Sequence, residues 1–213
     1  MTIAIVGGTG AEGTGLALRF ARAGAQVRIG SRDLARAQAA AARIRETAQS
    51  TSVEGYLNND AVRESDVIVL TLPAESQIET LLGLSANLPP GAVVVDATVQ
   101  LKPESTESSG LCSAQRAARN LPEGTRVAAA FHTLGADLLM QLDHGIDSDV
   151  LVCADDPEAK RVAVELVAML PGARAVDAGP LRNGRLIENL VSLLIAINRR
   201  NKVKHAGIRI TGL

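Results

Sequence analysis

A glycine-rich turn between a short apolar strand and a helix constrains this fold more than any other feature. The strand is expected at Thr2–Val6, and the turn follows as Gly7-Gly8-Thr9-Gly10-Ala11-Glu12-Gly13, which contains the spacing Gly-x-Gly-x-x-Gly. In such a turn the first glycine permits a tight reversal, the second lets the backbone approach a pyrophosphate, and the third lets helix and strand pack closely. The helix N-terminus then presents unpaired N–H groups and a partial positive charge. The pattern predicts a dinucleotide-binding unit; a glycine-rich turn that binds nothing is the alternative.

The rest of the chain alternates short β-branched runs with longer helical patterns. This alternation predicts an α/β fold: a Rossmann-type doubly wound, mostly parallel sheet with a small C-terminal α/β extension. Strands are expected at Thr2–Val6, Gln26–Gly30, Asp66–Leu72, Ala92–Asp96, Arg126–Phe131, Asp149–Cys153 and Ala173–Val176, with a weak one near Val53. Helices are expected at Gly13–Ala23, Asp33–Thr47, Pro157–Leu170 and Arg185–Arg200.

The end of the second expected strand indicates which dinucleotide binds. NAD-selective domains place an acidic residue about 20 residues beyond the glycine loop, where it holds the ribose 2′-hydroxyl. Here the strand ends Ile29-Gly30-Ser31-Arg32, without an acid at that place. Ser31 can donate to a 2′-phosphate, and Arg32 and Arg36 can pair with it. Asp33 is expected to serve as an acid at the N-terminus of the next helix. These residues favour NADP over NAD; the alternative is that the two arginines belong to a solvated helix face.

Composition argues against several other classes of protein. Aromatic residues make up 1% of the chain and the formal net charge is −1, so neither base stacking nor a basic surface for nucleic acid is expected. Cys112 and Cys153 lack disulfide or metal spacing, and His144 and His205 lack ligand partners, so no metal site is expected. No signal peptide precedes the first strand and no apolar stretch is long enough to cross a membrane, which predicts a cytoplasmic protein.

Two segments outside the glycine loop bear on substrate and assembly. Thr98 to Gly110 is expected to be an exposed loop after the carboxyl end of a strand, where ligands bind in such sheets. The last expected helix is apolar over more than one stripe, through Leu186, Ile187, Leu190, Val191, Leu193, Leu194 and Ile197. A helix with that much apolar surface needs two partners, the sheet and a second subunit, so we predict a homodimer. Residues 1–213 are thus expected to form one NADP-binding Rossmann domain, in which a segment from about 145 to 213 serves dimerisation and the substrate side.

Further motifs are spread over the chain from Met1 to Leu213. They are Gly7-Gly8-Thr9-Gly10, Gly15-Leu16-Ala17-Leu18-Arg19, Gly30-Ser31-Arg32, Leu70-Thr71-Leu72-Pro73, Phe131-His132-Thr133, Asp177-Ala178-Gly179-Pro180-Leu181-Arg182-Asn183 and Ala206-Gly207-Ile208. With this combination the whole chain resembles the NADPH-dependent reductases of the deazaflavin coenzyme F420, the F420H2:NADP oxidoreductases.

The resemblance implies an oxidoreductase that transfers a hydride between NADPH and coenzyme F420. By that resemblance, the residues from Thr9 to Glu12 bind the pyrophosphate, and Ser31, Arg32 and Arg36 bind the 2′-phosphate. The deazaflavin ring is implied to lie against the nicotinamide, between the loops that follow Leu72, Asp96 and His132. The full set of expected cofactor-binding residues is Gly8, Thr9, Gly10, Ala11, Glu12, Ser31, Arg32, Arg36, Leu72, Ser76, Val99 and Ala136.

The substrate side departs from the family pattern at two places. Leu134-Gly135 and Ala97-Thr98 stand where the family tends to have proline-containing turns. These departures keep two alternatives open. One is an NADPH-dependent reductase of a flavin or a small imine or carbonyl compound, and the other is a non-catalytic NADP-binding sensor.

Hydride transfer between two flat rings needs orientation and a dry pocket rather than a catalytic triad. His132 follows an expected strand and is the best ionisable candidate for the site. It is expected either to deliver the proton that reduction of a deazaflavin requires, or to hydrogen-bond the backbone and shape a turn. The second interpretation is favoured, because backbone groups can stabilise the ring equally well.

Overall fold

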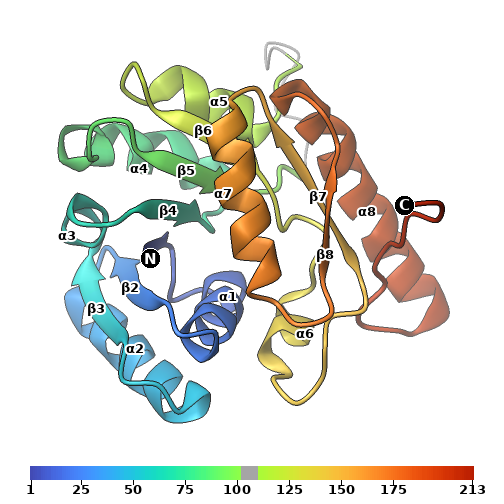
Figure 1. Ribbon diagram of the computed structural model, residues 1–213, viewed down its shortest axis with the longest axis horizontal. Helices are drawn as coiled ribbons and strands as arrows, with labels where there is room; N and C mark the ends of the chain where they lie inside the picture. The colour runs from blue at the N-terminus through green and yellow to red at the C-terminus, as the bar shows by residue number, and fades with distance from the viewer. Residues whose placement is uncertain (102–109) are drawn as a thin grey trace.

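Eight strands form one continuous sheet in the computed structural model, which describes residues 1–101 and 110–213 (Figure 1). They are β1 (Thr2–Val6), β2 (Gln26–Ser31), β3 (Val53–Leu57), β4 (Val67–Leu70), β5 (Val93–Asp96), β6 (Arg126–Ala129), β7 (Asp149–Ala154) and β8 (Arg174–Asp177). Their spatial order is β3-β2-β1-β4-β5-β6-β7-β8. Strands β1 to β6 are parallel, β7 runs antiparallel to β6, and β8 is parallel to β7. The strand order reverses between β1 and β4, and such switch points are where doubly wound folds bind dinucleotides.

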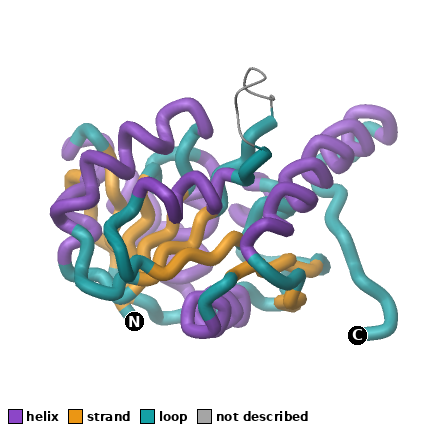
Figure 2. Tube along the Cα trace, turned by 90° about the horizontal axis from the view of Figure 1, so that it is seen from above, coloured by secondary structure: helices purple, strands orange, loops and turns teal. Residues whose placement is uncertain are grey.

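Helices cover both faces of this sheet (Figure 2). They are α1 (Ala11–Arg22), α2 (Leu34–Ala48), α3 (Asn58–Arg63), α4 (Gln77–Leu84), α5 (Ser113–Asn120), α6 (Ala136–Met140), α7 (Pro157–Ala168) and α8 (Gly184–Asn201). The strands are apolar on both sides: in β1, Ile3 and Ile5 enter one apolar layer while Ala4 and Val6 enter the other. Burial of both faces is what a parallel sheet requires. The first layer includes side chains of α1, α2, α6 and α7, and the second includes side chains of α3, α4, α5 and α8.

The expected α/β doubly wound architecture is confirmed, with differences at several boundaries. The strand expected at Arg126–Phe131 ends at Ala129, because Phe131 adopts a left-handed φ of 71° that no strand can accommodate. The helix expected from Gly13 begins two residues earlier, at Ala11. Thr98 is buried, so the prediction of an exposed loop is wrong at that residue, and residues 102–109 of that loop lie outside the described part. Within the described residues, no helix combines the length and hydropathy needed to cross a membrane.

Candidate functional site

The glycine loop makes a tight turn from β1 into α1. The N–H of Gly8 donates to the carbonyl oxygens of Ile5 and Gly30, each at 3.2 Å, and the N–H of Gly10 donates to Gly7 O at 2.9 Å. Gly7 has a φ of +83°, and a Cβ there would lie 2.6 Å from the Thr71 carbonyl oxygen. Gly10 occupies the N-cap position of α1 and has no side chain to cap the helix. The first-turn N–H groups of α1 are therefore left for an anion.

The third glycine of the motif is required by close packing. A Cβ on Gly13 would lie 2.7 Å from the Gly8 Cα and 2.6 Å from the Thr71 Oγ1. Contacts that short cannot be relieved by side-chain rotation, because Gly8 contributes backbone. The expected role of Gly13 in bringing helix and strand together is thus seen directly in the packing.

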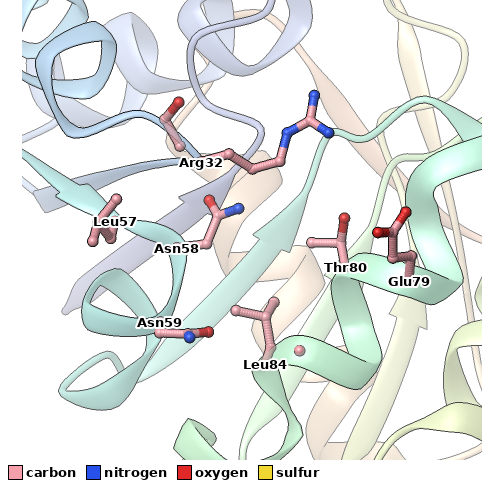
Figure 3. Close-up of a pocket in the computed structure, with 9 residues that line it drawn as sticks. Arg32, Leu57, Asn58, Asn59, Glu79, Thr80 and Leu84 are labelled. Atoms are coloured by element: carbon pink, nitrogen blue, oxygen red, sulfur yellow. The ribbon is translucent and has the colours of Figure 1, made fainter.

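Two adjoining cavities open beside this loop, at the carboxyl ends of β2, β3 and β4. The larger has a volume of about 320 Å³ and the smaller about 160 Å³. Figure 3 shows the larger one, with Arg32 and Asn58 on one side and Thr80 and Glu79 of α4 on the other. Gly7 of the glycine loop lines the smaller cavity. So do six of the expected cofactor-binding residues: Thr9, Ser31, Arg32, Arg36, Leu72 and Ser76. Both cavities share Ser31, Arg32, Asn58 and Thr80.

Hydrogen-bond donors dominate the end of this cavity next to β2. Arg32 and Arg36 are both exposed to it, and the buried Ser31 places its Oγ 3.2 Å from the Asp33 N–H, from which it accepts. The nearest acid, Asp33, is the N-cap of α2 and its Oδ1 accepts from the Arg36 N–H at 3.1 Å. The expectation that Asp33 serves the helix N-terminus is confirmed. The cavity end therefore suits a phosphate rather than a ribose hydroxyl pair.

Asn58 and Thr80 line both cavities but were not among the expected site residues. Asn58 is the first residue of α3 and its Oδ1 is buried without a hydrogen-bond partner in the described structure. Figure 3 shows its amide nitrogen on the side of the cavity. The sequence signal was a polar residue directly after β3, but β3 itself was expected only weakly. Thr80 lies in α4, a helix that the sequence analysis did not delimit.

Glu12 lies in the first turn of α1, at the place expected for pyrophosphate binding. Its Oε1 is buried without a hydrogen-bond partner in the described residues, and burial raises the pKa of this carboxyl to about 8. A carboxyl with that pKa is mostly protonated at neutral pH. Glu12 therefore does not place a full negative charge beside the first-turn N–H groups of α1.

The expected substrate side lies at the carboxyl ends of β5 (Val93–Asp96) and β6 (Arg126–Ala129). His132 follows the left-handed Phe131 and is buried. Burial lowers the pKa of His132 to about 4, against a smaller opposing effect of the Thr98 backbone, so the ring is neutral at pH 7. Val99 and Ala136 are both half-buried, and neither lines the two cavities described above. Val99 lies just before the undescribed residues 102–109.

Ala136 begins α6, which packs against α1 directly behind the glycine loop. A Cβ on Gly15 would lie 2.6 Å from the Leu139 Cβ and 3.4 Å from the Ala136 carbonyl oxygen. The buried Arg19 of α1 donates hydrogen bonds to four carbonyl oxygens in and after α6, those of Leu138, Leu139, Gln141 and His144. The close approach at Gly15 brings the amino end of α6 near α1, on the side where the expected Ala136 contact would be made. The Arg19 bonds hold the carboxyl end of α6 to the last turn of α1.

Metal chemistry has no visible support at this site. In residues 1–101 and 110–213, no group of three or more His, Cys, Asp or Glu side chains is arranged to hold a metal ion. The donors at the cavity are hydroxyl, amide and guanidinium groups, which suit an anionic dinucleotide.

Comparison with known proteins agrees with this geometry. The profile of the family described as "NADP oxidoreductase coenzyme F420-dependent" matches residues 2–100, which contain the glycine loop and both cavities. The F420-dependent NADP reductase of Methanothermobacter thermautotrophicus is 45% identical over 226 aligned residues, covering 100% of this chain and 96% of the relative. The enzyme of the same description from Methanocaldococcus jannaschii is 38% identical, over 100% of this chain and 99% of the relative.

A solved structure from Arthrobacter sp. FB24, given the provisional description of an F420-dependent NADP reductase, superimposes with a TM-score of 0.82. The match covers 99% of both chains at 23% sequence identity. At that level of identity it supports the fold alone. The match extends through β7, β8 and α8, so the C-terminal third of the chain follows the same architecture.

Proposed function

This chain belongs to the family of coenzyme F420-dependent NADP oxidoreductases, and from that membership we propose that the carboxyl edge of its sheet transfers a hydride between NADP(H) and F420. It is an oxidoreductase with NADP(H) and F420 as its two substrates. The observation that carries the proposal is the sequence identity of 38–45%, over the whole length of this chain, to relatives described as F420-dependent NADP reductases. The donor-rich cavity at the end of β2 supports the NADP half independently.

NADP(H) is proposed to lie across the switch point between β1 and β4. The free N–H groups at the start of α1 bind the pyrophosphate, since Gly7 to Gly13 bring that backbone close to the ligand. Ser31, Arg32 and Arg36 bind the 2′-phosphate, with Asn58 as a further donor. The remaining expected contacts, Leu72, Ser76, Val99 and Ala136, then line the path toward the nicotinamide.

The nicotinamide supplies or accepts the hydride, and the protein supplies orientation and exclusion of water. Because its pKa of about 4 keeps His132 neutral, we assign it a turn-shaping role rather than that of proton donor. Both of its ring nitrogens are buried without a hydrogen-bond partner among the described residues. Reduction of F420 by NADPH consumes one proton besides the hydride, and solvent is the proposed source of that proton. Phe131 has a left-handed φ and the next residue, His132, is buried, which supports a role in shaping the substrate side.

The first experiment mixes the purified protein with NADPH and oxidised F420 and follows the loss of the oxidised deazaflavin absorbance. Rapid bleaching with NADPH and slow bleaching with NADH is the expected result. Absence of bleaching despite tight NADPH binding would refute the F420 assignment and direct the search to flavin, imine or carbonyl acceptors. Absence of NADPH binding would refute the site as well.

The 2′-phosphate assignment is tested by Arg32→Ala. The lost charge-assisted contact is worth about 1.5–3 kcal/mol, so the Kd for NADPH should rise about 10- to 150-fold while that for NADH changes little. Arg43→Ala is the matched control, because Arg43 is exposed on α2, the helix that follows Arg32, and lines neither cavity. Equal losses for NADPH and NADH would contradict the assignment.

A homodimer that pairs through α8 is also proposed. Leu186, Leu193 and Ile197 are 67%, 55% and 37% exposed, and together with the half-buried Leu190 they form one stripe along the helix. Ile187 and Leu194 are buried on the adjacent face of the helix. This distribution supports the dimerisation role proposed for the segment from about 145 to 213. Leu193→Glu should give a monomer in sedimentation velocity, whereas Ser192→Glu, on a different face of α8, should leave the dimer intact. A wild-type protein that is a monomer at micromolar concentration would refute the proposed homodimer.

A cytoplasmic location is proposed for the same protein. Cys112 and Cys153 are both free and buried, as is usual for proteins of reducing compartments. Cell fractionation with an antibody against the native protein tests the location, and recovery with the envelope or the medium would contradict it.

A further inference from the structure

Asp96 is a fully buried carboxyl at the last position of β5, directly beneath the substrate side. Its Oδ1 accepts from the Thr98 N–H at 3.1 Å and its Oδ2 accepts from the Gln77 Nε2 at 3.0 Å. No ion pair to this carboxyl is found among the residues that the structure describes. Burial raises the pKa of Asp96 to about 7, and the nearby Glu188 acts in the same direction. A buried acid without a cation is expensive to keep, so its two partners call for an explanation.

The first partner belongs to the wall of the NADP cavity. Gln77 begins α4 and is itself fully buried. It follows Ser76 directly, and Ser76 lines the smaller cavity together with Leu72 and Thr80. A contact that fixes Gln77 therefore fixes the start of α4 and the cavity wall that precedes it.

The second partner belongs to the segment that follows β5, outside the two cavities. The backbone ladder continues one residue beyond β5, where the Ala97 N–H donates to Leu70 O at 2.9 Å. Thr98 is the next residue, and within the described structure its N–H is held by the Asp96 carboxyl. Thr98 leads to Val99, and its backbone lies near the buried His132. Asp96 thus ties the segment after β5 to the start of α4.

We propose that Asp96 is a positioning residue for hydride transfer, because its carboxyl sets the separation between the α4 wall and the segment from Thr98 to Val99. The adenosine end of NADP(H) is bound on the first side, and the nicotinamide meets the deazaflavin on the second. This inference rests on the proposed function. It deepens that function by adding a residue that touches neither substrate.

The geometry distinguishes positioning from a need for negative charge. An asparagine at position 96 can accept from the Thr98 N–H through its Oδ1 and donate through its Nδ2. The Gln77 Oε1 is buried without a partner in the described residues, so a half-turn of that amide offers an acceptor to the new Nδ2. Asp96→Asn therefore keeps both ties without the charge. Asp96→Leu has the same number of side-chain heavy atoms in a similar branched shape, is larger, and removes both.

The test measures the two halves of the site separately. The Kd for 2′,5′-ADP, measured by titration calorimetry, reports on the adenosine half of the site. The Kd for NADPH, measured through its nicotinamide fluorescence, also includes the nicotinamide half. For Asp96→Leu we expect a Kd for 2′,5′-ADP within about threefold of wild type, while kcat for F420 reduction falls about 10- to 100-fold, as a misplacement near 1 Å would produce. Asp96→Asn should retain kcat within about threefold.

Two further variants keep the proposal falsifiable. Gln77→Leu cuts one tie only and should give an intermediate kcat even if Asp96→Leu does not fold. Glu188→Gln is the matched control: Glu188 is buried nearby and accepts from the Ser113 N–H at 2.7 Å, a bond that glutamine can keep. It should behave as wild type.

Wild-type kcat in both Asp96→Leu and Gln77→Leu would overturn the proposal, as would an Asp96→Asn variant as slow as Asp96→Leu. Parallel loss of 2′,5′-ADP binding and kcat would also overturn it, because that pattern indicates a merely structural residue. If the wild-type protein does not reduce F420, the proposed function fails. The positioning role of Asp96 is then tested by the ratio of the affinities for NADPH and 2′,5′-ADP. A ratio that collapses in Asp96→Leu and not in Asp96→Asn supports positioning, and an unchanged ratio refutes it.

Discussion

Replacing Arg19 with methionine should detach α6 from α1. Arg19 is 3% exposed, and its guanidinium donates to the carbonyl oxygens of Leu138 at 3.1 Å, Leu139 at 2.9 Å, Gln141 at 2.6 Å and His144 at 3.0 Å. Methionine fills most of the same volume but donates no hydrogen bond. The carbonyl groups at the carboxyl end of α6 then lose the donor that replaces their missing helical partners.

The size of the effect follows from these four bonds. A hydrogen bond that involves a charged group contributes about 1.5–3 kcal/mol, which gives an upper limit of about 6–12 kcal/mol for the set. Gln141 and His144 are exposed, so their carbonyl oxygens can bind water instead. Removing the guanidinium also removes its own desolvation cost. A net loss of about 3–5 kcal/mol in the free energy of unfolding is therefore expected, because the carbonyl oxygens of the buried Leu139 and the half-buried Leu138 lose this donor, at about 1–3 kcal/mol for each unsatisfied group.

Urea and thermal unfolding of the purified protein measure this loss. For a chain of this size about 1 kcal/mol corresponds to about 2–4 °C, so the midpoint should fall by about 6–20 °C. Arg22→Met is the matched control, because Arg22 is exposed on the same helix, one turn later. Arg19→Lys keeps the charge but has a single ammonium, so an intermediate loss is expected. A loss below about 1 kcal/mol for Arg19→Met would refute the reasoning, since it would mean that water replaces the guanidinium at no cost.

Three further predictions concern the site. Gly13→Ala places a Cβ 2.7 Å from the Gly8 Cα, so NADPH affinity should fall about 100-fold in a fluorescence titration; wild-type affinity would contradict the packing argument. Ionisation of Glu12 above its pKa of about 8 should weaken NADP⁺ binding by about 1 kcal/mol between pH 7 and pH 9, as measured by calorimetry. Glu12→Gln should abolish that pH dependence. A pH dependence that persists in the variant would show that another group is responsible. The pKa of His132 is lowered to about 4, so its contribution is present above the unfolded value of about 6.5 and is lost as the pH falls through 4. Relative to His132→Leu, the wild type should lose about 3 kcal/mol of unfolding free energy from pH 7.5 to pH 4. Comparing the two proteins cancels the opposite effect of Asp96, whose pKa is raised and which both contain. A difference in unfolding free energy that stays constant with pH would refute this prediction for His132.

Features that depend on neighbouring residues were predictable from the sequence. The glycine loop, the cap at Asp33 and the donors at Ser31 and Arg32 each follow from local backbone geometry and from the end of one strand. The doubly wound sheet followed from the alternation of apolar runs, because strands covered on both faces have continuous apolar sequences. Six of the expected cofactor-binding residues line the smaller cavity, and their role in binding stays a prediction.

Other parts of the site depend on segments that are distant in sequence. Asn58 and Thr80 line the same cavities because α3, which begins at Asn58, packs against both β2 and α4. The Asp96 carboxyl joins Gln77 to Thr98, and Arg19 reaches carbonyl groups more than a hundred residues away, as far as His144. A single polar residue in an apolar stretch carries no signal for its partner. The sequence by itself determined the local turns and the order of elements, because these obey backbone and periodicity rules within one segment. Only the packing of the two apolar layers decided which polar groups face each other, because that pairing minimises unsatisfied buried donors and acceptors over the whole fold.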